Sequence, residues 1–153
     1  MKLFADTCDI LSKESGSIKK IEIISNAIKQ IKNDQELNLF CLYLTGLIYP
    51  ASIQKTINVG KALIRDAICK LTGITNVKWE ENYKKFGETG EAVEYILQNH
   101  NSIPSGLLKN SLEYKPNENF SLIELSQYIE KLSETSGSLA KVEILKELFS
   151  QLS

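Results

Sequence analysis

The chain has little of what metal sites and disulfide-rich proteins require. It contains a single histidine, His100, and its three cysteines, Cys8, Cys41 and Cys69, lie far apart in apolar stretches. No Cys-x-x-Cys or His-x-x-x-His spacing occurs, so a zinc site of ordinary ligand spacing is not predicted. An odd number of widely spaced cysteines is typical of reduced thiols in the cytosol. We therefore expect no metal and three buried, free thiols.

Long apolar runs and an excess of one charge are also absent. No segment approaches the roughly 18 apolar residues that a membrane helix needs. The first residues include Lys2, but also Asp6 and Asp9, and no long apolar region follows them. A signal peptide is therefore not predicted. The net charge of −1 argues against a strongly basic nucleic-acid binder, although a local basic patch remains compatible with it. These features predict an intracellular, cytoplasmic protein without a membrane role.

Helical periodicity is what the chain does have. Its 153 residues, 42% apolar and 24% charged, suffice for an ordinary domain with a core. Apolar residues recur every three or four positions, and no alternation typical of strands occurs. The predicted fold class is therefore all-α, a compact multi-helix domain. The expected helices cover residues 2–12, 18–31, 37–49, 60–71, 78–86, a stretch reaching residue 97, and two further helices after residue 120, with Trp79 in the core.

Residues 98–119 interrupt this pattern. They hold two of the three prolines together with many Asn and Ser residues, which is typical of a linker or an exposed loop. The predicted organisation is a first helical half at 1–97, this linker, and the start of a second half at 120–153. Just after the linker, Ser121 and Glu124 have the spacing of a capping box at a helix start.

One stretch occurs twice. The sequence LSKESGSIKKIEII at 11–24 is repeated as LSETSGSLAKVEIL at 132–145, with eight of fourteen positions identical. Each copy is predicted to end one helix, turn at Ser-Gly-Ser and begin the next helix. Ser17 and Ser138 are expected as N-caps, and the glycine permits a sharp turn.

The repeated lysines stand at an unfavourable place for a cation. Lys20 and Lys141 fall in the first turn of a helix, where the helix dipole disfavours positive charge by about 0.3–1 kcal/mol. Free backbone amides, a hydroxyl and an ammonium group at one point would suit an anion such as phosphate. A purely structural turn is the other interpretation, with Glu22 and Glu143 pairing with lysines on the helix surface. The residues alone leave both interpretations open.

The chain contains, in order, the expected helix over Phe4–Leu11 and the segments ESGSIKKIEIISNAI, LYLTGLIYP, INVGKALIRDAICKLTG, YKKFGETGEAVE and LIELSQYIEKLSETSGSLAKVEILKELF. Together they resemble the N-terminal, all-helical DNA-binding domain of ATP-dependent DNA ligases. In that family the domain has internal pseudo-symmetry, and each half contributes one such turn to the minor-groove side of nicked DNA. The resemblance therefore accounts for the repeat.

The chain departs from the family pattern at four places. The first turn has Gly16-Ser17-Ile18 where the family often has Arg, which weakens the expected clamp. The stretch 57–60 keeps only the second glycine of the family's Leu-Gly-Ile-Gly. The Gly-Arg-x-Arg-x-Gly loop of the second half is absent, and no Lys-x-Asp-Gly occurs. The resemblance thus implies a fragment that lacks the catalytic domains.

The resemblance implies binding, not chemistry, for this chain. The longer enzyme would use ATP and Mg²⁺ to adenylate itself, pass AMP to the 5′-phosphate of a nick and join the 3′-hydroxyl, in DNA replication, repair and recombination. No catalytic or cofactor-binding residue is expected here. The expected DNA-binding residues are Ser15, Gly16, Ser17, Lys19 and Lys20 in the first turn, Asn58, Gly60 and Lys61 at another helix start, and Ser136, Gly137, Ser138 and Lys141 in the second turn.

The expected partners are nicked duplex DNA, in a nucleoid-associated location, and the catalytic domains of the same longer chain. A homodimer of the fragment is a further expectation, because Leu145, Leu148 and Phe149 could lack a partner on the last helix. We expect that replacing Lys20 and Lys141 together by Ala weakens DNA binding with little change in melting temperature. A helical protein-interaction scaffold is the rival hypothesis, although two distant copies lack the tandem period of a solenoid. A helix-turn-helix regulator would need a basic recognition helix, which is absent.

Overall fold

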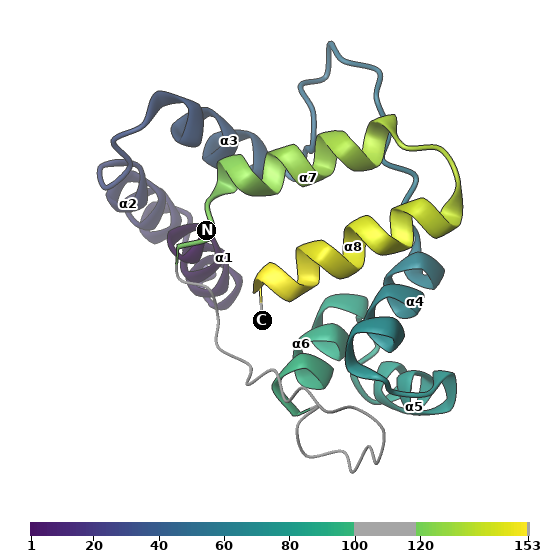
Figure 1. Cartoon of the computed structure of the whole chain (residues 1–153). Coiled ribbons are helices and arrows are strands. Elements are labelled where there is room, and N and C mark those ends of the chain that lie inside the picture. The colour runs from purple at the N-terminus through teal and green to yellow at the C-terminus, as the bar shows by residue number, and fades with distance from the viewer. Residues whose placement is uncertain (100–118, 153) are drawn as a thin grey trace. The chain divides into compact units, whose positions relative to one another are not determined.

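The computed structural model describes residues 1–99 and 119–152, and these form eight α-helices without a strand (Figure 1). The all-α prediction is confirmed. Within the described ranges, no helix has the length and apolar character needed to cross a bilayer. The helices are α1 Lys2–Lys13, α2 Ser17–Ile28, α3 Asp34–Leu44, α4 Lys61–Thr72, α5 Asn76–Phe86, α6 Thr89–Asn99, α7 Leu122–Glu134 and α8 Ser138–Leu152.

The capping box predicted before α7 is present. The Glu124 N–H donates to Ser121 Oγ at 3.1 Å, and the N–H and hydroxyl of Ser121 both donate to Glu124 Oε2 at 2.8 Å. These hydrogen bonds favour the ionised carboxylate and lower the pKa of Glu124. A local sequence signal therefore fixes where α7 begins.

Helix α3 is shorter at its C-terminal end than the apolar run that predicted it. The expected helix continued to residue 49, before Pro50, whereas α3 ends at Leu44 and Gly46 adopts a φ of +79°. At its other end, Asn33 Oδ1 accepts the Glu36 N–H at 3.0 Å, so the helix begins earlier than expected. The turn residues, and not the apolar run, set both ends.

The chain divides into two compact units that are each discontinuous in sequence. Unit 1 comprises Met1–Thr56 and the described part of 118–130, and unit 2 comprises the described parts of 57–117 and 131–153. The division predicted from the sequence placed its linker at 98–119, most of which lies outside the described residues. That division into sequence halves stays a prediction.

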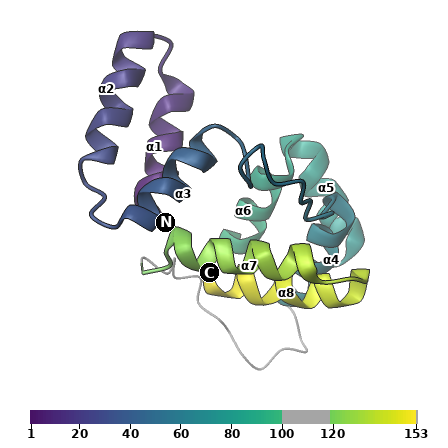
Figure 2. The ribbon, with the colours of Figure 1, turned by 90° about the horizontal axis from the view of Figure 1, so that it is seen from above.

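Aromatic and aliphatic side chains from α1, α2, α3 and α7 form the core of unit 1. Phe40 and Leu122 are almost completely buried, and the Phe4 ring meets Phe40 edge-on with centroids 5.6 Å apart. Each such side chain stabilises the fold by about 1.5–3 kcal/mol on burial. Helices α1 and α2 pack side by side (Figure 2). The amino group of Met1 donates to the Phe120 carbonyl at 2.6 Å, which ties α1 to the segment before α7.

In unit 2, helix α4 lies at the centre and packs against α5, α6 and α8. One side of α4 buries Ile68 against Trp79, which is fully buried as predicted. A neighbouring side of α4 buries Ala67 against Leu145 of α8. Leu148 is also buried and Phe149 packs against both clusters, so these apolar residues of α8 are covered. The expectation of an unpartnered last helix, on which the homodimer rested, was wrong.

The three cysteines are free, but they are not all buried as predicted. Cys8 and Cys69 are half-buried, and burial raises the pKa of both thiols. Cys41 is exposed and lines an apolar groove of about 890 Å³ between α3 and the first part of α7, within unit 1. An apolar stretch of sequence does not reveal which face of its helix is buried, because α3 turns Phe40 inward.

Candidate nucleic-acid interface

The first repeated turn joins α1 to α2. Gly16 is extended, with φ −80° and ψ 121°, and it is the N-cap of α2. The Lys20 N–H donates to the Gly16 carbonyl at 3.0 Å, so Ser17 is the first helical residue. The prediction that Ser17 caps the helix was wrong, because α2 has no side-chain cap hydrogen bond.

A carboxylate that the sequence interpretation overlooked occupies this turn. The Gly16 N–H donates to Glu14 Oε1 at 2.7 Å, and Lys19 Nζ lies 3.8 Å from Glu14 Oε2. A negative charge beside the N-terminus of α2 is favoured by the helix dipole and offsets the unfavourable placement of Lys19 and Lys20. The Gly16 amide is therefore already bonded, and a phosphate at this point would compete with Glu14. An acidic residue two positions before the glycine is the sequence signal for this contact.

The second repeated turn joins α7 to α8 and has a different backbone. Gly137 adopts a φ of +94°, where an L side chain is strained. The Lys141 N–H donates to the Gly137 carbonyl at 3.2 Å, and Ser138 is again the first helical residue and not the cap. Thr135 stands where the first copy has Glu14, and its hydroxyl donates to the Lys131 carbonyl at 2.7 Å. Thus no glutamate is available at that position to bond the turn.

Both turns present hydroxyl groups and one aliphatic side chain to solvent. Ile18 is 83% exposed and Leu139, its counterpart in the repeat, is 77% exposed. Among residues 1–99 and 119–152, no hydrogen-bond partner exists for the turn hydroxyls. These exposed hydroxyls belong to Ser15, Ser17, Ser136 and Ser138.

The two repeated lysines have different environments. Lys20 is partly exposed, and within the described part of the chain its ammonium group has no hydrogen bond or ion pair. Lys141 is 7% exposed, and its Nζ donates to the carbonyl of Ile57. Lys141, which the sequence predicted to contact phosphate, therefore points into unit 2 and donates a hydrogen bond to its backbone.

That contact brings together two of the three predicted segments. Ile57 and Val59 pack against the cluster of Ala67 and Leu145, whereas Asn58, with a φ of +47°, and Gly60 are exposed. Gly60 is the extended N-cap of α4. Residues 57–61 and 136–141 are thus joined within unit 2, while the residues of the first turn belong to unit 1.

The side chain of Lys61 is held by α5. Its Nζ lies 3.5 Å from the centroid of the Tyr83 ring and 3.8 Å from Glu80 Oε2. A cation over an aromatic face gains about 0.5–1 kcal/mol at an exposed site. Because the side chain is 40% exposed, the ammonium group remains open to solvent on one side.

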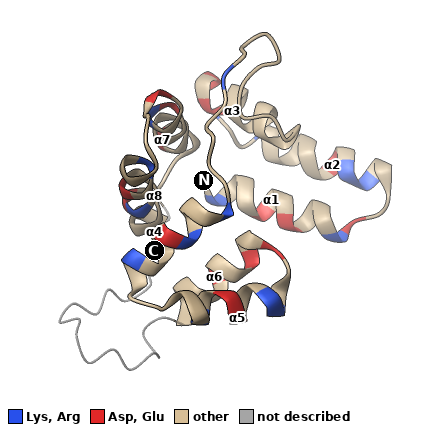
Figure 3. Cartoon of the chain, turned by 90° about the vertical axis from the view of Figure 1, so that its right-hand side faces the viewer, with Lys and Arg blue, Asp and Glu red and all other residues tan. Residues whose placement is uncertain are grey.

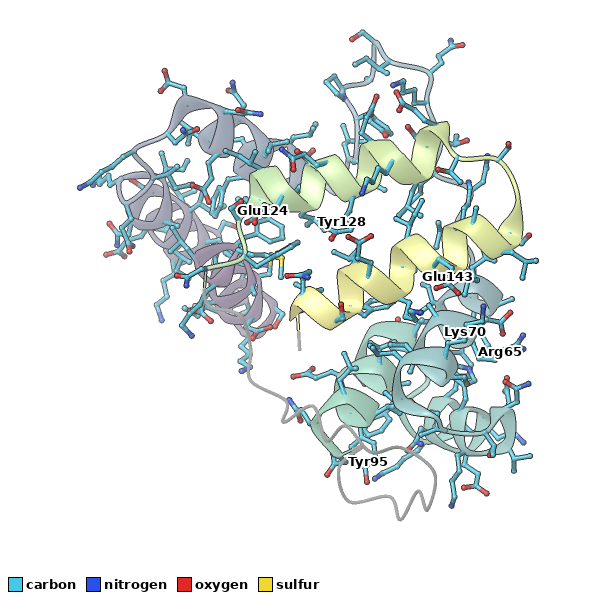
Figure 4. The ribbon with its side chains drawn as sticks, viewed as in Figure 1. Arg65, Lys70, Tyr95, Glu124, Tyr128 and Glu143 are labelled. Carbon is cyan, nitrogen blue, oxygen red and sulfur yellow. The ribbon has the colours of Figure 1, made fainter. Side chains whose placement is uncertain are left out.

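Acidic and basic residues alternate along the helices, as the colours of the ribbon in Figure 3 show. In unit 2, Glu143 of α8 lies next to Lys70 of α4 (Figure 4), with an N–O distance of 3.0 Å, and it also pairs with Lys146 at 2.7 Å. The hydrogen bonds from Lys146 and Lys70 lower the pKa of Glu143. Glu143 thus forms ion pairs with two lysines. The interpretation of the repeat as a purely structural turn predicted such pairing for Glu143.

The fold defines an all-α protein. In each of two helix–helix connections, the start of the second helix faces solvent. The family described as DNA ligase N terminus matches residues 1–153, and the chain therefore belongs to this family. It is 24% identical over 151 residues to a probable DNA ligase of Koribacter versatilis, which covers 99% of the chain and 24% of that protein. It is 25% identical over 145 residues to DNA ligase 2 of Methanosarcina acetivorans, which covers 95% of the chain and 25% of that protein.

A DNA ligase of Methanobrevibacter smithii is 27% identical over 153 residues, which covers 97% of the chain and 25% of that protein. The chain thus spans about a quarter of the length of these curated relatives. The family membership that the sequence resemblance predicted is confirmed.

Proposed function

We propose that this chain is the non-catalytic, DNA-binding part of an ATP-dependent DNA ligase that holds duplex DNA around a nick through its phosphate backbone. The observation that carries the proposal is the solvent-facing pair of Ser-Gly-Ser turns at helix starts in a chain of the DNA ligase N-terminal family. Backbone contacts of this kind position a duplex without reading its sequence.

Neutral donors would make most of the contacts. The exposed serine hydroxyls of both turns and the Asn58 amide can donate to phosphate oxygens. Lys19 and Lys20 would add charge in the first turn, and Lys61 would do so at the start of α4. Lys141 is buried and is not one of these charges. The proposed interface therefore has few cations, in keeping with the net charge of −1.

The longer protein would seal nicks in DNA replication, repair and recombination, inside the cell and on the nucleoid. ATP and Mg²⁺ belong to that longer protein in this proposal. The chain contains no Lys-x-Asp-Gly sequence, and across 1–99 and 119–152 no group of three or more His, Cys, Asp or Glu side chains is arranged to hold a metal ion. No residue of this chain is therefore assigned to either group.

A salt titration tests the proposal. Fluorescence anisotropy of a 5′-fluorescein-labelled nicked duplex should show weak binding at low salt that falls steeply toward physiological salt. Each phosphate neutralised by a cation contributes about −0.9 to the slope of log K against log salt. With three lysines in the interface we expect a slope of about −3, which is the same for a second duplex of unrelated sequence.

A helical protein-interaction scaffold is the alternative function. The exposed Ile18 and Leu139, at equivalent positions, favour it, because bare aliphatic side chains also suit a protein partner. The same titration separates the two functions. An absence of binding, or an affinity that stays flat with salt, supports the scaffold and contradicts the DNA-binding proposal.

A further inference from the structure

Lys141 is the one charged side chain among the buried residues of the described chain. It is 7% exposed, and its ammonium group donates to the Ile57 carbonyl, 84 residues earlier in the sequence. Burying an ammonium group is costly unless it is hydrogen-bonded, and the long side chain of lysine usually reaches solvent. A lysine held inside therefore points to a specific use of this contact.

The contact fixes the segment that precedes α4. The Ile57 carbonyl is the single backbone group of 57–59 with a hydrogen bond, as far as the structure describes the chain. Ile57 and Val59 insert into the cluster around Leu145, and the intervening Asn58 is turned outward with a φ of +47°. Lys141 thus holds the one strained residue of this segment in its outward orientation.

The other end of the contact lies one turn into α8. Ser138 and Leu139, at the start of that helix, are exposed, and Lys141 is the first buried residue after them. One side chain therefore ties two solvent-facing segments of unit 2 together, 58–60 and 136–139. Among the described residues, no other hydrogen bond or ion pair joins these two segments.

We propose that Lys141 is a positioning residue, which sets Asn58 and Gly60 beside the second Ser-Gly-Ser turn so that both segments bind one phosphate backbone. Lys141 itself does not contact the phosphates. This inference rests on the proposed function. Lys20, its counterpart in the repeat, has no hydrogen bond or ion pair in the described part of the chain, and in the proposed function it would contact phosphate directly.

Salt dependence distinguishes positioning from contact. In Lys141→Met, affinity for the labelled nicked duplex should fall about five- to tenfold, the loss expected for one or two hydrogen bonds to phosphate. The slope of log K against log salt should not change, since Asn58 and the Gly60 amide are neutral. In Lys20→Ala the slope should become shallower by about 0.9. Lys146→Met, which removes an exposed charge from the same helix, is the matched control and should bind like the wild-type chain.

A double-mutant cycle tests the link to Asn58. Asn58→Ala should weaken binding in the wild-type chain and should weaken it much less in Lys141→Met, because the segment is no longer held in place. A purely structural lysine would give additive effects. Circular dichroism melts of each variant show that binding is compared between folded chains.

Acetylation footprinting of the wild-type chain avoids any folding defect of a variant. Lysines that react with acetic anhydride are identified by mass spectrometry in the free chain and in the DNA complex. We expect Lys141 to stay unmodified in both states, and Lys20 to react in the free chain and to be protected by DNA. A Lys141 that reacts freely and is protected by DNA overturns the inference.

The outcomes also separate the inference from the proposed function. If the wild-type chain and all variants fail to bind DNA, the proposed function is wrong and the inference falls with it. If the wild-type chain binds and Lys141→Met makes the salt slope shallower as Lys20→Ala does, the inference alone is wrong.

Discussion

The two Ser-Gly-Ser turns have the same central residues but differ in most of the contacts that these residues and their neighbours make. Gly16 is extended with a φ of −80°, whereas Gly137 has a φ of +94°. The Gly16 amide is bonded to Glu14, which Thr135 replaces in the second copy. The lysine of the first copy is partly exposed, and that of the second is buried.

The difference shows that identical residues do not fix the conformation of a turn. The residue that decides the first turn, Glu14, lies outside the identical positions, and so does its ion-pair partner Lys19. The residue that decides the second, Ile57, lies far away in the sequence. A repeat in sequence therefore predicts two helix–turn–helix pairs correctly, but it does not predict two equal binding sites.

The largest expected effect concerns the stability contributed by the two lysines. Lys141→Ala leaves the Ile57 carbonyl unpaired and should lower the free energy of unfolding by about 1–3 kcal/mol. Lys20→Ala should change it by less than about 0.5 kcal/mol, as is usual for surface positions. Urea unfolding followed by circular dichroism measures both. Equal effects would contradict the asymmetry. If both effects are small, the sequence-based expectation of little change in melting temperature on replacing the two lysines is correct.

The second effect concerns the two glycines. Gly137→Ala forces a side chain into a left-handed conformation and should cost about 1–2 kcal/mol. In Gly16→Ala the new Cβ would lie 3.2 Å from Glu14 Oε1, the end of a flexible side chain, so the cost should stay below about 0.5 kcal/mol. Thermal melts of both variants provide the comparison. A larger loss for Gly16→Ala would mean that the Glu14 contact is rigid.

The third effect concerns the carboxylate of the first turn. Glu14→Gln removes a negative charge that competes with phosphate at a helix start, where charge is worth about 0.3–1 kcal/mol, and should raise DNA affinity roughly two- to fivefold. Thr135→Glu should lower it by a similar factor. Anisotropy with the nicked duplex measures both changes. Glu22→Gln is the control, because it removes an exposed negative charge from α2, away from the turn. An equal gain in affinity for this variant would mean that only the net charge of the chain matters.

The smallest effect is the pH dependence of the repeated glutamates. Glu143 has a pKa below its ordinary value of 4.5, whereas Glu22 has no ion pair in the described part of the chain. A carboxylate with a lowered folded-state pKa stabilises the fold above its unfolded pKa and loses that contribution as the pH falls through the folded value. The stability difference between the wild-type chain and Glu143→Gln should therefore shrink from about pH 6 to about pH 3. For Glu22→Gln the difference should be small at every pH.

Much of the fold could be predicted from the sequence, because the signals for a helix lie within the helix and its flanking residues. The capping box at Ser121 and Glu124 was predicted and is present, and the periodic apolar residues located the helices. The end of α3 was not predicted, because Gly46 stops the helix inside an apolar run. Exposure of Cys41 was missed for a related reason, since the run conceals which face packs inward.

The candidate interface was less predictable than the fold. Both turns face solvent, which the phosphate interpretation of the repeat requires. The role of Glu14 and the burial of Lys141 depend on contacts that no local pattern records. Long-range hydrogen bonds, such as that from Lys141 to Ile57, are set by tertiary packing, and spacing along the chain carries no information about them.

The discontinuity of unit 1 has a consequence for how the chain folds during translation. Phe40 emerges from the ribosome early, yet its core is completed by Leu122 and Leu125, which are made only after the stretch up to residue 117. At ordinary elongation rates this is a delay of seconds, during which the apolar face of the first three helices stays open. Nascent chains halted before α7 should therefore bind chaperones through Phe40, and release should coincide with synthesis of Leu125.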